Sequence, residues 1–190
     1  KTHENGDSIY NGAIDNASGV AGIITLAEYF SRHPSKRSII FLATTAEETF
    51  FQGAEHYLNN PVIPLDQTII GLNLDMMNFL GPIDSIEIAP LPYTNAIDQV
   101  SKIAEKMKIG LKLTATDRAY YNFRVESYPF ALKDILVMNL SFAEIEGQYP
   151  SFSSSELKEI VNSGGLNYHT PFDEIKPWFR YDGILQELEL

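Results

Sequence analysis

The sequence contains no cysteine among its 190 residues. Disulfide bonds and cysteine-based metal sites are therefore excluded. Any zinc site in this chain must use histidine and carboxylate ligands. No apolar run approaches the ~20 residues that a membrane-spanning helix needs. We therefore expect no membrane span, and no signal peptide is visible in the sequence.

Basic residues are also scarce. The chain has 14 lysines and arginines against 25 aspartates and glutamates, which gives a formal net charge of -11. A nucleic-acid partner would require a basic face, so we expect no such partner. The acidic balance is compatible with ordinary solubility and with a cation-binding site.

Apolar residues are plentiful, at 44% of the chain, and the length predicts one domain over residues 1–190. Two hydrophobic patterns alternate along the sequence. One has helical spacing, and the other is a short continuous apolar run typical of buried strands. The predicted helices span residues 17–32, 49–59, 94–108 and 178–190. The predicted strands span residues 38–43, 68–76, 85–90, 111–115 and 134–142.

This alternation predicts an α/β fold, with helices packed on both sides of a central, mostly parallel sheet in a three-layer α/β/α sandwich. Sites in such sheets form at the carboxyl ends of the strands. Five acidic or histidine residues lie at predicted strand ends or in adjoining loops, and we expect them to converge. They are Asp15, Glu47, Glu48, Asp75 and His169.

Clustered carboxylates repel one another unless a cation neutralises them. Oxygen and imidazole ligands suit Zn²⁺. In a turn after a strand, one residue of the Glu47–Glu48 pair can bind a metal while the other acts as a general base. Each residue also has an ordinary interpretation. Asp15 is typical of a turn or helix cap, the glutamate pair of a solvated surface, and His169 of a structural or surface histidine.

Four segments resemble the M28 family of zinc aminopeptidases, in the family's order and over essentially the whole chain. They are "GDSIYNGAIDNASGVA", "IIFLATTAEET", "GLNLDMMN" and "YHTPFDE". The resemblance implies a zinc-exopeptidase fold and a co-catalytic pair of zinc ions. Asp15 would bridge the two ions, Glu48 and His169 would complete one site, and Asp75 would belong to the other. Glu47 would be the general base acting on a zinc-activated water. A cis peptide bond between Asp15 and Asn16 is also implied.

The family pattern includes an upstream His-x-Asp element that this chain lacks. The chain begins at Lys1 rather than Met. We therefore expect an N-terminally truncated catalytic domain without its first strands, whose own activity is uncertain. His3 is a candidate replacement for the upstream histidine ligand, or else part of a surface loop. Residues 123–135 resemble a family region that lines the site. Glu126 stands there where the family has aspartate, and Arg124 is a candidate substrate-binding residue or a structural ion-pair partner.

The implied function is hydrolysis of the N-terminal residue of peptide substrates. Three alternatives remain open: a glutaminyl-cyclase-like relative, a carboxypeptidase-like relative and a non-catalytic binding module on the same fold. The resemblance also implies a secreted or periplasmic location. The preferred N-terminal residue and the oligomeric state are not predicted.

Overall fold

The computed structural model describes residues 6–89, 96–113, 125–142, 155, 167 and 169–189. The chain divides into two compact units. Unit 1 consists of Lys1–Pro34, Asp75–Asp84 and Glu144–Leu190, and unit 2 consists of Ser35–Leu74 and Ser85–Ala143. Each unit combines segments that are distant in sequence, so its core forms from long-range contacts.

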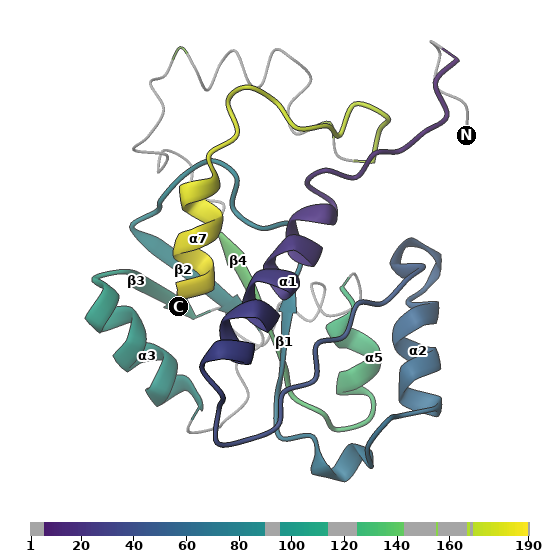
Figure 1. Ribbon diagram of the computed structural model, residues 1–190, viewed down its shortest axis with the longest axis vertical. Coiled ribbons are helices and arrows are strands. Elements are labelled where there is room, and N and C mark those ends of the chain that lie inside the picture. Colours follow the sequence, from purple (N-terminus) through teal and green to yellow (C-terminus); the bar gives the residue numbers. More distant parts are fainter. Residues whose placement is uncertain are drawn as a thin grey trace. The chain divides into compact units, whose positions relative to one another are not determined.

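Two helices characterise unit 1, and they lie side by side (Figure 1). Helix α1 spans Ala17–Arg32, and helix α7 spans Tyr181–Glu189. The Asn16 side chain caps α1 by accepting a hydrogen bond from the Gly19 N–H at 2.9 Å. This bond satisfies one of the amide groups left unpaired at the start of a helix. The helix ends at Arg32, and its C-cap residue His33 precedes Pro34.

Residues 75–84 connect these two helices within unit 1. The Met77 N–H donates to the hydroxyl of Ser18 in α1 at 3.0 Å. The Asn78 N–H donates to Glu187 in α7 at 2.7 Å. Beside these bonds the buried ring of Phe79 packs against Trp178 and Phe179. Polar and aromatic contacts therefore fix the segment that follows Asp75.

Unit 2 contains a mixed four-stranded sheet among the described residues. Its strands are β1 (Gly71–Leu74), β2 (Ser85–Ala89), β3 (Gly110–Leu113) and β4 (Val137–Phe142). The order is β1-β4-β2-β3, with β1 parallel to β4, β2 parallel to β3, and β2 antiparallel to β4. Parallel pairs are thus in the majority, as predicted.

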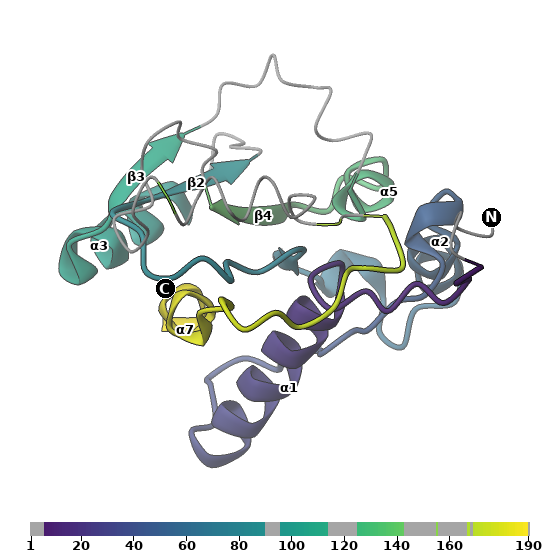
Figure 2. The same cartoon turned by 90° about the horizontal axis from the view of Figure 1, so that it is seen from above.

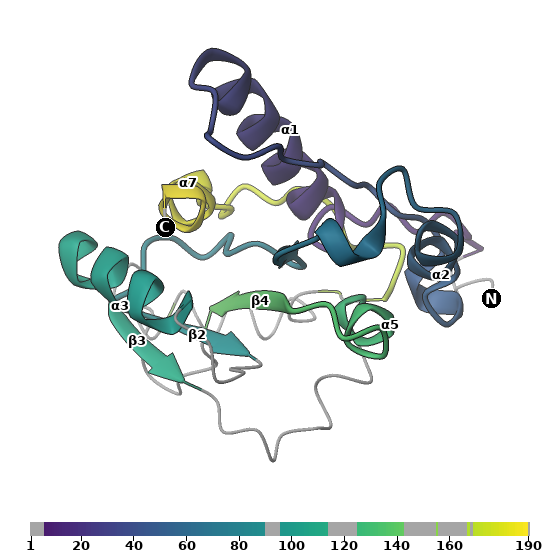
Figure 3. The same ribbon diagram turned by 90° about the horizontal axis from the view of Figure 1, so that it is seen from below.

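In its described part, unit 2 has the helices α2 (Gln52–Asn59), α3 (Ala96–Met107) and α5 (Ser127–Ala131). Helices α2 and α5 are neighbours in Figure 3. Leu58 of α2, Ile135 and Val137 of β4 form a buried apolar cluster. Strands β1 and β4 are further joined by the Asn73 amide, which donates to Asn139 at 3.1 Å. The Asn139 amide in turn donates to Ser127 of α5 at 2.9 Å.

Most predicted elements are present. Helix 17–32 is confirmed at both ends, whereas the predicted helix 49–59 begins only at Gln52, after a 3-10 turn at Glu47–Thr49. The predicted strand 68–76 is confirmed over four residues, Gly71–Leu74. Helix α5 was not expected from the sequence. It lies in the stretch whose family resemblance suggested a site-lining role.

The predicted strand 38–43 is wrong for this structure. These residues form no strand within the described part of the chain, and Ile39, Ile40 and Phe41 are exposed. A continuous apolar run predicts burial, but a strand also requires a neighbouring strand for its backbone hydrogen bonds.

No described helix is both long enough and apolar enough to cross a membrane.

Candidate metal centre

The loop that carries Asp15 is a tight turn before α1. Gly12 has a φ of +61°, and a Cβ atom at this position would lie 2.6 Å from the Asp15 carbonyl oxygen. Only glycine adopts this conformation and tolerates this approach without strain. The Gly12 carbonyl accepts a hydrogen bond from the Ala17 N–H at 2.9 Å. The predicted cis peptide bond between Asp15 and Asn16 is confirmed.

His169 lies on a second tight turn. The Thr170 N–H donates to the Asn167 carbonyl at 3.1 Å, and the Asp173 N–H donates to the Thr170 carbonyl at 3.2 Å. The Thr170 hydroxyl accepts from the Phe172 N–H at 3.2 Å. His169 itself has a φ of +57°. Such a conformation is uncommon for a residue other than glycine and is tolerated where surrounding bonds enforce it.

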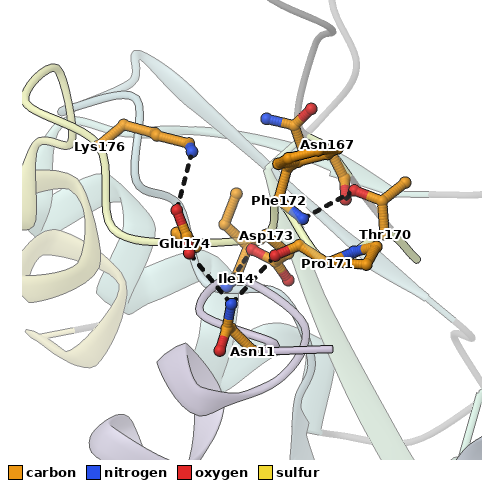
Figure 4. Close-up of polar contacts among 9 residues, drawn as sticks. All are labelled: Asn11, Ile14, Asn167, Thr170, Pro171, Phe172, Asp173, Glu174 and Lys176. Atoms are coloured by element: carbon orange, nitrogen blue, oxygen red, sulfur yellow. Dashed lines mark hydrogen bonds and ion pairs between the residues drawn. The ribbon is translucent and has the colours of Figure 1, made fainter. Parts of the chain in front are cut away.

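Direct hydrogen bonds join these two turns (Figure 4). The Asp173 carboxylate accepts from the Ile14 N–H at 2.9 Å and from the Asp15 N–H at 3.0 Å. The Asn11 amide donates to the Pro171 carbonyl at 3.0 Å and to Glu174 at 3.2 Å. Figure 2 shows the segment before α7 running beside the segment before α1. Residues from opposite ends of the chain are therefore held together.

The result is a carboxylate–imidazole pair. Nε2 of His169 lies 3.3 Å from Oδ2 of Asp15. The Asp15 side chain is 18% exposed and that of His169 is 43% exposed, so a solute can reach the pair. A carboxylate beside a protonated histidine is an ion pair, and beside a neutral histidine it supplies two of the ligands that Zn²⁺ prefers. The donor chemistry of these two residues fits zinc.

Asp75 belongs to the same unit and directly follows β1, as predicted. The residue that follows Asp75 is hydrogen-bonded to the residue that follows Asp15. The Met76 N–H donates at 3.3 Å to the side-chain oxygen of Asn16, the residue that also caps α1. Asn16 therefore joins the segment that follows Asp75 to the start of the helix that follows Asp15.

Glu47 and Glu48 form a 3-10 turn in unit 2. Three residues around them adopt left-handed backbone conformations: Ala46, Phe50 and Phe51. Hydrogen bonds enforce this turn, among them Thr49 N–H to the Ala46 carbonyl at 3.3 Å and Phe51 N–H to the Glu47 carbonyl at 3.0 Å. A 3-10 helix has three residues per turn, so adjacent side chains diverge by about 120°. The two glutamates therefore point in different directions, as their predicted separate roles require.

Two other predicted residues, His3 and Arg124, lie outside the described residues. Glu126 is described, in unit 2. Its burial raises the pKa of the carboxyl, while a hydrogen bond from the Thr44 hydroxyl opposes that rise. Glu126 is therefore tied to the stretch that precedes Glu47.

Sequence reasoning gave no role to Asp173 or Asn11. Both lie within segments that were singled out, "YHTPFDE" and "GDSIYNGAIDNASGVA". An aspartate next to a glutamate on a loop ordinarily indicates a solvated surface. Their partners lie about 160 residues away in sequence, and no local pattern encodes such a contact.

The family model for peptidase family M28 matches residues 2–184. Among curated proteins, the vacuolar membrane protease of Schizophyllum commune is 33% identical over 70 residues, which is 37% of this chain and 8% of that protein. The vacuolar membrane protease of Pyrenophora tritici-repentis is 36% identical over 63 residues, which is 32% of this chain and 7% of that protein.

Solved structures match over nearly the whole chain. LapB from Legionella pneumophila aligns with a TM-score of 0.67 at 16% identity, covering 96% of this chain and 46% of that chain. An aminopeptidase from Aneurinibacillus sp. strain AM-1 aligns with a TM-score of 0.62 at 21% identity, covering 96% of this chain and 38% of that chain. This chain thus spans less than half of each of these two structures. It has the α/β fold of these proteins, and by the match over residues 2–184 it belongs to peptidase family M28.

Proposed function

We propose that this protein is a zinc-dependent aminopeptidase that removes the N-terminal residue of peptides. Family membership supports a metallopeptidase, and one of the similar solved structures is an aminopeptidase. The observation that carries the proposal is the Asp15–His169 pair, with 3.3 Å between Nε2 and Oδ2. Two turns from opposite ends of the chain hold a carboxylate and an imidazole together, which is the donor set that zinc uses in a protein without cysteine.

In this proposal Asp15, Glu48, Asp75 and His169 hold the metal. Bound zinc would supply Lewis-acid polarisation of the scissile carbonyl and would lower the pKa of water. Glu47 would take a proton from the attacking water and deliver it to the leaving amine. The left-handed residues on both sides of Glu47 and Glu48 support a constrained catalytic turn, because strain of this kind gathers at functional sites.

The free α-amine of the substrate would bind near the acidic residues of the centre. This requirement separates an aminopeptidase from a carboxypeptidase and from a binding module on this fold. A carboxypeptidase would need a cationic partner for the substrate carboxylate, and a binding module would need no base. Secretion or a periplasmic location, and one domain over residues 1–190, remain predictions.

The test replaces Glu47 by glutamine and measures two quantities, zinc per chain and hydrolysis of aminoacyl p-nitroanilides. Glu47→Gln preserves the shape of the side chain but removes its basicity. We expect zinc content to stay unchanged and turnover to fall by about 10²–10⁴-fold, the usual contribution of a general base.

The control substrate is the same p-nitroanilide with an acetylated α-amine, which an aminopeptidase should leave intact. Near-normal turnover in Glu47→Gln would remove Glu47 from the mechanism. Equal hydrolysis of the acetylated and free substrates would contradict exopeptidase action at the amino terminus.

A further inference from the structure

Asp173 is an unusual residue for its position. It lies on a loop, beside the exposed Glu174, yet it is only 2% exposed. A buried carboxylate is unfavourable unless hydrogen bonds compensate for the lost water. Its partners therefore reveal what keeps it there.

Those partners are two consecutive backbone amides. The Ile14 N–H donates to Oδ1 at 2.9 Å, and the Asp15 N–H donates to Oδ2 at 3.0 Å. The Asp173 carbonyl also accepts from the Ala13 N–H at 3.1 Å. Both carboxylate oxygens are thus used on the loop that carries Asp15, and hydrogen bonds to an ionised acceptor are stronger than those to a neutral one.

The same residue closes the turn that directly follows His169. The Asp173 N–H donates to the Thr170 carbonyl at 3.2 Å. Only three residues separate Asp173 from His169. Asp173 therefore bonds to Asp15 itself and to Thr170, the residue next to His169. One side of Asp173 thus fixes the loop that carries Asp15, and its own N–H fixes the turn that follows His169.

We propose that Asp173 is a positioning residue that sets the separation and orientation of Asp15 and His169 for metal binding. This inference rests on the metal-binding function proposed above. A hydrogen bond that fixes the backbone amide of Asp15 restricts rotation about its N–Cα bond. It therefore restricts the direction of the Asp15 carboxylate. Groups that orient ligands in this way commonly change metal affinity by 10–100-fold when they are altered.

The chemistry of the acceptor explains why an aspartate is needed. An asparagine has the same shape but one acceptor oxygen, and its NH₂ group only donates. In Asp173→Asn one of the two amides, that of Ile14 or Asp15, would therefore face another donor. The loop that carries Asp15 would have to shift to avoid this contact.

The test compares zinc affinity in the full chain and in Asp173→Asn, using competition with a chromophoric chelator. Cobalt(II) absorption provides a second readout, since it reports the arrangement of ligands around the ion. We expect zinc affinity to fall by 10–100-fold in Asp173→Asn and the cobalt spectrum to change. Unchanged affinity and spectrum in the folded variant would overturn the inference.

Two controls separate positioning from general stability. Glu174→Gln alters the neighbouring exposed residue but keeps an oxygen for the Asn11 amide, and we expect zinc affinity within twofold of the parent chain. Leu80→Ala removes a buried side chain of the same unit and lowers its stability without touching either turn. If Leu80→Ala weakened zinc binding as much as Asp173→Asn, the role of Asp173 would be structural only.

If Asp173→Asn fails to fold, Asn11→Ala decides the question. This exposed residue forms the second link between the turns, to Pro171 and Glu174, and its loss should weaken zinc binding by about 10-fold. No change would overturn the inference. If the parent chain and His169→Ala bound zinc equally, the proposed metal site itself would be contradicted, which is a different outcome.

Discussion

At the scale of single residues, two buried carboxylates each accept hydrogen bonds from backbone amides. Asp173 accepts from Ile14 and Asp15, and Glu187 accepts from Asn78. The two carboxylates differ in the number of backbone amides that donate to them. Asp173 has two amide donors on a loop, while Glu187 is 5% exposed within helix α7 and accepts from the Asn78 N–H. At Glu187 the effect of burial on the pKa is therefore larger than the effect of the hydrogen bond.

Glu187 makes stability dependent on pH. Burial raises its pKa from 4.5 to about 7, against the opposing effect of the Asn78 hydrogen bond. The folded state therefore keeps a proton that the unfolded chain releases between these values. The stabilising effect is complete below pH 4.5 and is lost as pH rises through about 7. From a difference of this size we expect a loss of roughly 3 kcal/mol.

The variant Glu187→Gln tests this effect, because glutamine stays neutral and can still accept from Asn78. We expect urea unfolding to show similar stability for both proteins at pH 4, and a variant more stable by roughly 1–3 kcal/mol at pH 8. Comparing the two proteins at each pH cancels the titration of all other groups. A stability difference that is the same at both pH values would contradict the assignment.

Sequence motifs predicted some of the contacts between individual residues but not others. Asp15 and His169 were expected to meet, and they do. We expected this contact because of the order of the motifs and because both residues lie at predicted strand ends or in loops. Asp173 was not expected to matter, since its burial arises from contacts with residues 14 and 15 at the other end of the chain.

At the scale of elements, helices were predicted more accurately than strands. The ends of α1 were predicted correctly because Asn16 caps one end and Pro34 follows the other. Its large apolar side chains, however, do not mark its buried face. Val20 and Ile24 are exposed, while Ser18, Gly19 and Gly22 are buried. The periodicity indicates a helix but does not show which side contacts its neighbours.

Strand prediction was limited for a related reason. Residues 38–43 and 71–74 both lie in apolar runs, yet within the described ranges only the second forms a strand, paired with β4. An apolar run of this kind indicates that its side chains favour burial. Pairing depends on a partner strand elsewhere in the chain, and the run itself does not encode which partner that is.

The start of α2 illustrates how a helix fixes the turn that carries Glu47. A Cβ atom on Gly53 would lie 2.3 Å from the carbonyl oxygen and 2.5 Å from the nitrogen of Thr45. Both atoms are backbone, so neither can rotate away. The Gly53 N–H also donates to that carbonyl at 3.0 Å. The bare backbone of Gly53 thus secures the turn that carries Glu47.

Gly53→Ala should therefore lower the free energy of unfolding by about 1–3 kcal/mol, as overpacking does, and should reduce peptidase turnover by displacing Glu47. The matched control is Glu55→Ala, an exposed position on the same helix, which should change stability by less than about 0.5 kcal/mol. Urea unfolding and p-nitroanilide hydrolysis measure the two effects. Equal stability of the Gly53 and Glu55 variants would show that the close approach to Thr45 is unimportant.

At the scale of the whole molecule, the proposed ligands come from both compact units. Asp15, Asp75 and His169 belong to unit 1, and Glu48 belongs to unit 2 together with the proposed base, Glu47. If the proposal holds, zinc binding should stabilise the chain as a whole. A ligand that binds only the folded state raises its stability in proportion to the logarithm of the ligand concentration.

The measurement that tests the central claim most directly is zinc content per chain, by elemental analysis after loading and desalting. It should compare the full chain with His169→Ala and with His56→Ala, a control histidine on the exposed side of α2. We predict at least one zinc ion per chain for the full chain and for His56→Ala, and a clear loss for His169→Ala. A full chain without zinc, or equal zinc in all three proteins, would contradict a metal centre at Asp15 and His169.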